Sequence, residues 1–277
     1  MTIEFPLTRI EPPQGGIQFP DVRAVWRYRD LLMVLIWRDL SARYRQSVVG
    51  YGWAFLKPAL SIVIFAFVFG QLAGLPSDGI PYPLFALAAL VPWNYFSTSL
   101  AGISASIVGG AGLFTKVYFP RLILPLASLG TGLAELGLQL LLMSGLMAWY
   151  GVRPGWQLLM LPGFIILAIL TSFAFGLWLA VLNVRYRDIG HVVPFLLQAW
   201  MWASPVVYSS QLVPERWRWA YSLNPMAGVI DGFRWSVLGT AAPDPMQILL
   251  SVGVVAVTSI VALACFRHQE STFADVV

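Results

Sequence analysis

Three arginines stand close together just before the first long apolar segment of the chain. They are Arg38, Arg43 and Arg45. A guanidinium group is a planar fork of donors that matches the oxygens of a phosphate group. This stretch therefore predicts a contact with phosphate at a membrane surface. Cationic residues beside an apolar segment also set membrane topology, and the sequence leaves both interpretations open.

Glu135 is the one charge in an otherwise apolar stretch from 122 to 152. An ionisable side chain inside a membrane span is costly and indicates function by default. A proton relay would need titratable partners, and none lies near Glu135 in the sequence. The simpler interpretation is that Glu135 faces a water-filled cavity or bonds to a neighbouring helix.

Aromatic side chains recur at helical spacing within the apolar segments. Phe65 and Phe69 are four residues apart and share a helix face, as do Gln198 and Trp202. An aromatic face beside a polar group suits a sugar ring, which offers C–H faces and hydroxyls. Packing or interfacial belts explain the same residues equally well. The aromatic residues predicted to line a channel are Phe65, Phe69, Trp200, Trp202 and Tyr208.

Motifs for catalysis, metals and nucleotides are missing from the sequence. The only two lysines, Lys57 and Lys116, fit no phosphate-binding loop. His191 and His268 are far apart in the sequence, and neither belongs to a recognisable metal-binding motif. The single Cys265 has no partner for a disulfide. No basic tract suggests nucleic acid. We therefore expect no enzymatic activity, no metal and no cofactor in this chain.

The elements that position these residues are long apolar segments. The chain has 277 residues, of which 58% are hydrophobic and 11% charged, against about 25% charged in soluble domains. A spanning helix needs roughly 20 apolar residues, and the runs do not alternate as β-barrel strands do. The sequence predicts an all-α integral membrane protein with six transmembrane helices, near 58–78, 84–108, 123–149, 158–182, 192–208 and 246–266.

The remaining stretches divide the chain into four parts. Residues 1–20 are predicted to be an irregular cytoplasmic N-terminus without a signal peptide, and 269–277 a cytoplasmic tail. Residues 21–57 form an interfacial and coupling region, in which a helix from Asp21 either lies in the membrane surface or packs on protein. Residues 58–268 hold the six spans.

The outer segment 209–244 lies between spans five and six. It carries the charge pair Asp231 and Arg234 at i,i+3 spacing, which would be costly in a full span. We predict one or two helices that dip into the membrane and return.

The positive charges predict the orientation of the spans. With both termini in the cytoplasm, 13 of the 17 Lys and Arg residues fall on the inner side. The rule that cytoplasmic loops carry the excess of positive charge supports this arrangement.

Five short stretches carry a resemblance to a known family. They are RDLSARYRQSVVG at 38–50, FPRLILP at 119–125, NVRYRD at 183–188, PERWRW at 214–219 and LNPM at 223–226. In this order and spacing the chain resembles the permease subunits of bacterial ABC exporters for surface polysaccharides, which handle O-antigens, capsules and teichoic acids. The resemblance covers roughly residues 25–270.

This resemblance implies partners and roles. The permease would be a homodimer in the bacterial inner membrane, with two copies of a separate cytoplasmic ATPase that binds ATP and Mg²⁺. Its substrate would be an O-antigen-like glycan on an undecaprenyl (pyro)phosphate carrier among the membrane lipids, held at the inner surface by Arg38, Arg43 and Arg45. The residues implied in coupling to the ATPase are Lys116, Arg121, Arg185, Arg187 and Asp188. Those implied in an outer gate are Trp217, Trp219, Tyr221, Asn224, Asp231 and Arg234.

Three rival interpretations remain. A permease of the same architecture could export a drug, haem or a lipid, although the five stretches favour a glycan. A membrane scaffold or assembly factor would need no ATPase partner. A membrane glycosyltransferase is disfavoured because clustered acidic residues are missing.

Overall fold

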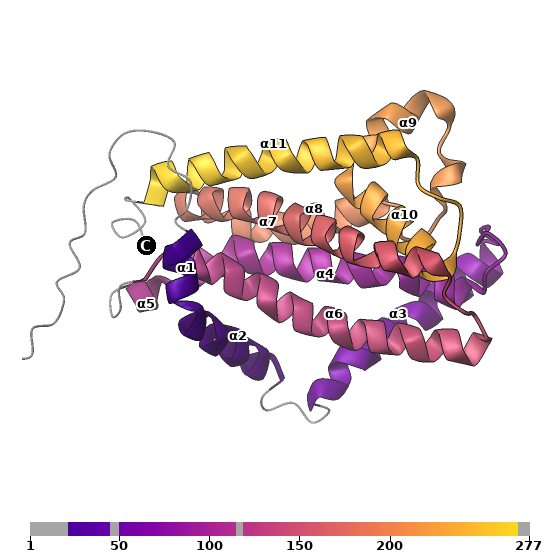
Figure 1. The fold of residues 1–277 in the computed structure, drawn as a ribbon, viewed down its shortest axis with the longest axis horizontal. Helices are drawn as coiled ribbons and strands as arrows, with labels where there is room; N and C mark the ends of the chain where they lie inside the picture. Colours follow the sequence, from indigo (N-terminus) through magenta and orange to yellow (C-terminus); the bar gives the residue numbers. More distant parts are fainter. Residues whose placement is uncertain (1–21, 45–49, 115–118, 271–277) are drawn as a thin grey trace, which may run out of the picture.

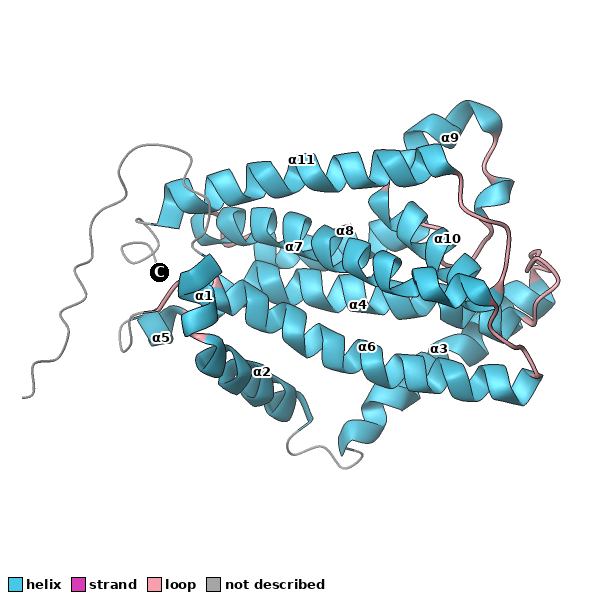
Figure 2. Cartoon of the chain, viewed as in Figure 1, coloured by secondary structure: helices cyan, strands magenta, loops and turns pink. Residues whose placement is uncertain are grey.

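The computed structural model describes residues 22–44, 50–114 and 119–270, and its regular elements there are all helical (Figure 2). Within these residues, five helical segments are long and apolar enough to cross a membrane. This confirms an all-helical integral membrane protein. The five segments are α3 with its π-helical continuation (Trp53–Phe65 and Ala66–Leu72), α4 (Tyr82–Gly109), α6 (Ile123–Tyr150), the 3₁₀ turn η3 with α7 (Trp156–Met160 and Leu161–Arg185), and α11 (Pro245–Glu270).

The predicted fifth span differs from the others. Helix α8 (Ile189–Trp202) has 14 residues, so it is about 21 Å long, whereas the hydrocarbon core is about 30 Å thick. Turns follow from Ala203, and Ser204 to Val207 are buried in the protein. Non-helical backbone at membrane depth is tolerated where protein covers it. Pro205 helps to end the helix, because a residue before proline avoids the helical conformation.

Helix α4 is the centre of the bundle. It packs against α6, α7 and α10, and side chains on all its faces are buried, among them Leu84, Phe85 and Leu100. The small-residue spacing Ser172-x-x-x-Gly176 lies where α7 meets α4. A Cβ added at Gly176 would lie 2.9 Å from the Cβ of Ile103, so only glycine permits this close approach.

Two short helices precede the bundle. Helix α1 (Val22–Arg27) is followed by α2 (Arg29–Tyr44), which packs on α6 through a cluster that includes Leu35, Ile123 and Ala127. The opposite face of α2 exposes Met33, Val34 and Trp37. One face of α2 therefore packs on protein, and the other exposes apolar side chains.

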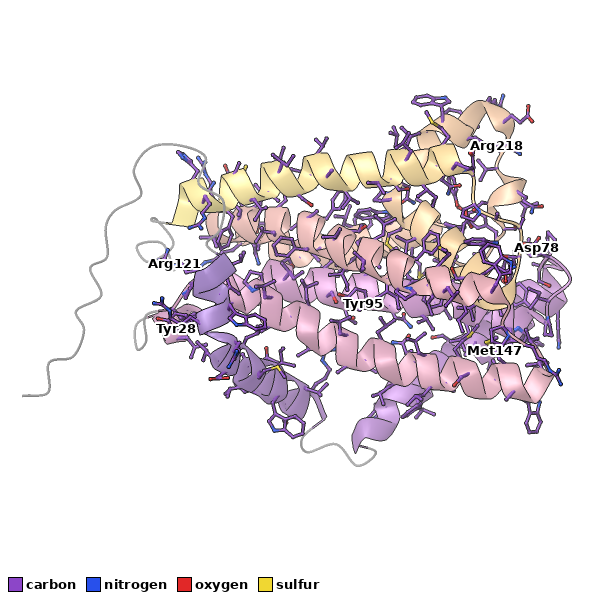
Figure 3. The ribbon with its side chains drawn as sticks, viewed as in Figure 1. Tyr28, Asp78, Tyr95, Arg121, Met147 and Arg218 are labelled. Carbon is purple, nitrogen blue, oxygen red and sulfur yellow. The ribbon has the colours of Figure 1, made fainter. Side chains whose placement is uncertain are left out.

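The two ends of the bundle carry different elements. Tyr28 and Arg121 lie at one end, and Asp78 and Arg218 lie at the other (Figure 3). Helix α1, the short α5 (Ala111–Phe114) and the end of α11 share the first end (Figure 1). We call the Arg121 end the inner end and the Asp78 end the outer end.

Candidate functional site

A polar cavity of about 680 Å³ opens between α3, α4 and α6, beside the end of α2. Tyr95, the neighbour of Asn94 in α4, lies about midway along the bundle (Figure 3). Polar groups at such a depth are costly in a membrane and are characteristic of ligand pathways. The polar side chains in the cavity wall are Arg43, Lys57, Ser61, Asn94, Thr98, Glu135 and Gln139.

Glu135 is paired across the cavity with Arg43. The guanidinium of Arg43 donates to the Glu135 carboxylate at 2.5 Å, and Glu135 is 9% exposed. The prediction that Glu135 bonds to a neighbouring helix is confirmed, and Glu135 also lines the cavity. The sequence alone does not identify Arg43 as the partner of Glu135, because the two residues are 92 positions apart.

Asn94 and Gln139 form a second polar link, which sequence reasoning missed. The side-chain amide of Asn94 donates to the Gln139 amide oxygen at 3.1 Å and so joins α4 to α6. Side-chain amides that bond across helices hold membrane bundles together. The available signal was an uncharged polar residue in the middle of each of two apolar segments.

The three arginines predicted to bind phosphate do not form one group in the described residues. Arg38 is exposed and pairs with its neighbour Asp39 at 2.8 Å. Arg45 lies outside the described residues. Of the two that are described, Arg43 lines the cavity, where Lys57 from near the start of α3 joins it.

The predicted aromatic residues divide into two groups. The rings of Phe65 and Phe69 meet edge to face at 5.6 Å, and Phe69 lies 6.3 Å from Trp202. This aromatic row joins α3 and its π-helical continuation to α8, and Trp202 is exposed. Tyr208 follows α8, and its hydroxyl donates to the Trp202 carbonyl at 3.4 Å.

Trp200 has a different environment. Its ring packs edge to face against Phe96 at 4.9 Å and Phe175 at 5.0 Å. Its indole N–H donates to the side chain of Asn224 at 2.8 Å. Within a single chain, Trp200 therefore packs between α4 and α7 and bonds to the outer segment.

The outer segment forms the turn η4 (Ser210–Leu212) and the helices α9 (Glu215–Ser222) and α10 (Pro225–Leu238). Trp217 and Trp219 on α9 are exposed, whereas most of α10 is buried against α4, α7 and α11. The predicted outer-gate residues therefore belong to one surface helix and one buried helix (Figure 1).

Asn224 joins the outer segment to α8. Its side-chain oxygen accepts from the backbone N–H of Met226 at 3.0 Å and caps α10, a helix that Pro225 then begins. Its amide donates to the Ala203 carbonyl and to the Ser204 hydroxyl. One side chain thus fixes both the end of α8 and the start of α10.

Arg234 is 3% exposed, and its guanidinium donates to three backbone carbonyls. The acceptors are Phe85 at 3.3 Å, Val206 at 3.0 Å and Tyr208 at 3.1 Å. The guanidinium also lies 3.7 Å from the centroid of the Phe85 ring. Arg234 therefore satisfies the non-helical backbone that follows α8.

Asp231 and Arg234 are not in direct contact, although the i,i+3 spacing predicted a charge pair. Among the described residues, no ion pair closer than 4.0 Å joins them. Asp231 instead accepts from the Ser210 hydroxyl at 2.5 Å and the Gln247 amide at 3.1 Å. The reason is that the Arg234 side chain turns toward the carbonyls, which no sequence spacing reveals.

A second cavity of about 290 Å³ lies at the outer end, and Tyr221, Asp231 and Gln247 are among its lining residues. Burial raises the pKa of the Tyr221 hydroxyl, and the neighbouring Tyr208 adds to the rise. Burial also raises the pKa of Asp231, although the hydrogen bond from Ser210 and the charge of Arg234 act against it. Across the described ranges, no three His, Cys, Asp or Glu side chains are grouped to hold a metal ion.

Three of the five predicted coupling residues are exposed in the turn between α7 and α8. Arg185 ends α7, and Arg187 and Asp188 follow it. Because α6 runs from the inner to the outer end and α7 returns, this turn lies at the inner end, where Arg121 also lies (Figures 1 and 3). Lys116 is outside the described residues.

This architecture defines a multispanning membrane protein with a polar cavity between its helices. A family model for the ABC-2 type transporter matches residues 30–238. The chain belongs to this family of membrane transport proteins.

Similar proteins are known over nearly the whole chain. An O-antigen export system permease protein RfbA from Myxococcus xanthus is 33% identical over 259 residues, which cover 92% of this chain and 98% of the relative. A protein of the same name from Klebsiella pneumoniae is 28% identical, covering 89% and 95% respectively. The polysialic acid transport protein KpsM of Escherichia coli is 26% identical, covering 85% and 92%.

Proposed function

We propose that this chain is the transmembrane subunit of an ATP-driven exporter that moves a lipid-linked surface polysaccharide out of the cytoplasm. The similarity to the O-antigen export permease of Myxococcus xanthus, at 33% identity over 98% of that protein, carries this proposal. The glycan would be O-antigen-like and linked to an undecaprenyl (pyro)phosphate carrier. The chain itself would be a permease and not an enzyme.

Two structural features support a glycan substrate. The aromatic row Phe65, Phe69 and Trp202 offers faces on which successive sugar rings can stack. Stacking tolerates different sugars, so a long polymer could move past it without a deep energy minimum. The polar cavity beside Arg43 and Lys57 offers cations to the charged end of a lipid-linked chain.

The finer architecture belongs to the same proposal. Helix α8 and the turns after it act as the fifth of six spans, with α9 and α10 as outer helices that do not cross the membrane. Two copies of the chain enclose the channel, and two copies of a separate ATPase bind ATP and Mg²⁺ at the inner end. The protein lies in the bacterial inner membrane with both termini in the cytoplasm.

Deletion of the gene tests the substrate. We expect finished lipid-linked glycan to accumulate at the inner face of the membrane, and complementation with this gene to restore it to the surface. Surface labelling followed by gel separation measures the two pools. Normal surface glycan in the deletion strain, with no second exporter present, would contradict a polysaccharide substrate and favour small-molecule efflux.

The turn after α7 is predicted to couple ATP hydrolysis to export. Removing its charges with Arg185→Gln, Arg187→Gln and Asp188→Asn should leave folded protein and ATP hydrolysis by the assembled complex but lower export, because all three side chains are exposed and available to a partner. Hydrolysis and export are measured on the same membranes.

The matched control is Arg153→Gln, which removes an exposed charge from the turn between α6 and α7 at the opposite end of the bundle. This variant should export normally. Export by the triple variant at the control rate, with the same ATP consumption, would exclude a coupling role for the turn.

A further inference from the structure

We propose that the 680 Å³ cavity between α3, α4 and α6 is a binding site for the phosphate headgroup of a membrane lipid, with Lys57 as the cation that contacts the phosphate. This inference deepens the proposed function and rests on it for the identity of the lipid, the polyprenyl carrier. It assigns the headgroup to a place that differs from the row of three arginines predicted from the sequence.

The charge of the cavity favours an anion. Among the described residues that line it, the charged ones are Arg43, Lys57 and Glu135, and their sum is one positive charge. Arg43 already donates to Glu135 at 2.5 Å, and the two charges offset each other. Among the described residues, no carboxylate forms an ion pair with Lys57. Lys57 is therefore the cation that a phosphate can engage without first breaking an ion pair.

The neutral side chains of the cavity suit the oxygens of a headgroup. Ser61 lies one turn beyond Lys57 on α3, and the linked amides of Asn94 and Gln139 form the facing wall. The two amide groups can donate to phosphate or to sugar oxygens. The Ser61 hydroxyl already donates to the Lys57 carbonyl at 3.0 Å and so offers its oxygen as an acceptor. A volume of 680 Å³ exceeds the need of a free phosphate ion and fits a headgroup with one sugar attached.

The surface beside the cavity suits the tail of a lipid. Leu56, Leu60 and Ile64 on α3 are 38%, 50% and 56% exposed, and each lies within one turn of Lys57 or Ser61. A ligand with its phosphate in the cavity would lay its chain along these apolar side chains. A soluble anion would gain nothing from this surface, so the cavity and the surface together indicate a lipid.

The depth of the cavity is compatible with a headgroup. Helices α4 and α6 have 28 residues each and are about 42 Å long, against about 30 Å of hydrocarbon. Part of the bundle therefore projects beyond the bilayer core. Glu135 is 12 residues from the start of α6, about 18 Å from the inner end of that helix, and so lies in its inner half.

Protection of a cysteine from labelling tests the site. Cys265→Ser removes the single native thiol, and Ser61→Cys places a thiol in the cavity wall. Val63→Cys is the matched control, because Val63 is also on α3, is 65% exposed and does not line the cavity. The full-length protein in lipid nanodiscs is treated with a maleimide, with undecaprenyl phosphate added in increasing amounts.

We expect undecaprenyl phosphate to slow labelling of the Ser61→Cys variant and not that of the Val63→Cys variant. Adding Lys57→Gln should raise the concentration needed for half protection about tenfold, whereas Lys57→Arg and Arg27→Gln, an exposed charge outside the cavity, should leave it unchanged. Equal protection by uncharged undecaprenol, no protection at all, or no labelling without lipid would each overturn the proposal.

Two further additions distinguish the source of the phosphate. Protection by phosphatidylglycerol equal to that by undecaprenyl phosphate would support the phosphate site and overturn its assignment to the carrier. Protection by inorganic phosphate alone would overturn the lipid. The assay contains neither glycan nor ATPase, so its failure leaves the export function standing, and a failed complementation leaves the site standing.

Discussion

Replacement of Arg234 by methionine is expected to lower the free energy of unfolding by about 3 kcal/mol or more. The guanidinium donates to the carbonyls of Phe85, Val206 and Tyr208, and methionine keeps the volume but donates to none of them. Three buried acceptors would lose their donor. The loss is measured as the fraction of monodisperse protein that survives heating in detergent.

Two variants control for this effect. Arg234→Lys keeps a charge but cannot reach three carbonyls at once, so its stability should lie between wild type and Arg234→Met. Arg218→Met removes an exposed guanidinium that is 3.9 Å from Glu215, and such pairs contribute about 0 to 1 kcal/mol. Wild-type stability of the Arg234→Met variant would show that the three contacts do not hold the segment after α8.

The ion pair between Arg43 and Glu135 should give an asymmetric double-mutant cycle. Arg43→Met leaves the buried carboxylate of Glu135 without its Arg43 contact, and we expect a loss of about 2 kcal/mol or more. Glu135→Gln leaves a side chain, Arg43, that is 42% exposed and can be hydrated, so the loss should be about 1 kcal/mol. Thermal stability of each variant in detergent measures both.

The double variant completes the cycle. Because the two side chains contact each other, the sum of the single losses should exceed the loss in the double variant by about 0.5 to 3 kcal/mol. Asn94→Ala combined with Arg43→Met is a control from the same cavity wall. The stability losses of these two single variants should be closer to additive. Additive losses for Arg43 and Glu135 would mean that their contact does not stabilise the attachment of α2 to α6.

The sequence alone predicts the long helices well because their signal is local. Any run of about 20 apolar residues must satisfy its own backbone in lipid, and helix formation does so without reference to the rest of the chain. The predicted spans near 84–108 and 123–149 therefore agree with α4 and α6 within a few residues. The resemblance to the family also rests on short stretches that can be recognised in the sequence alone, such as the NVRYRD stretch at 183–188.

The length of α8 could not be predicted from the apolar run. The stretch 192–208 is uncharged and mostly apolar, yet the helix ends at Trp202 and the chain turns. The non-helical backbone is stable because Arg234, more than 25 residues later, supplies donors to Val206 and Tyr208. A hydropathy pattern contains no information on a donor that arrives from another helix.

The composition and spacing of this sequence determined a helical membrane protein of a recognisable transport family. Apolar runs and short motifs can be identified within one segment, without knowledge of how the segments pack. The tertiary structure decided which polar residues meet. It placed Arg43 against Glu135, linked Asn94 to Gln139, and turned Arg234 away from Asp231. The hydrogen bonds of Arg43, Asn94 and Arg234 join residues far apart in the chain. Only the packing of the helices brings these groups within hydrogen-bonding distance.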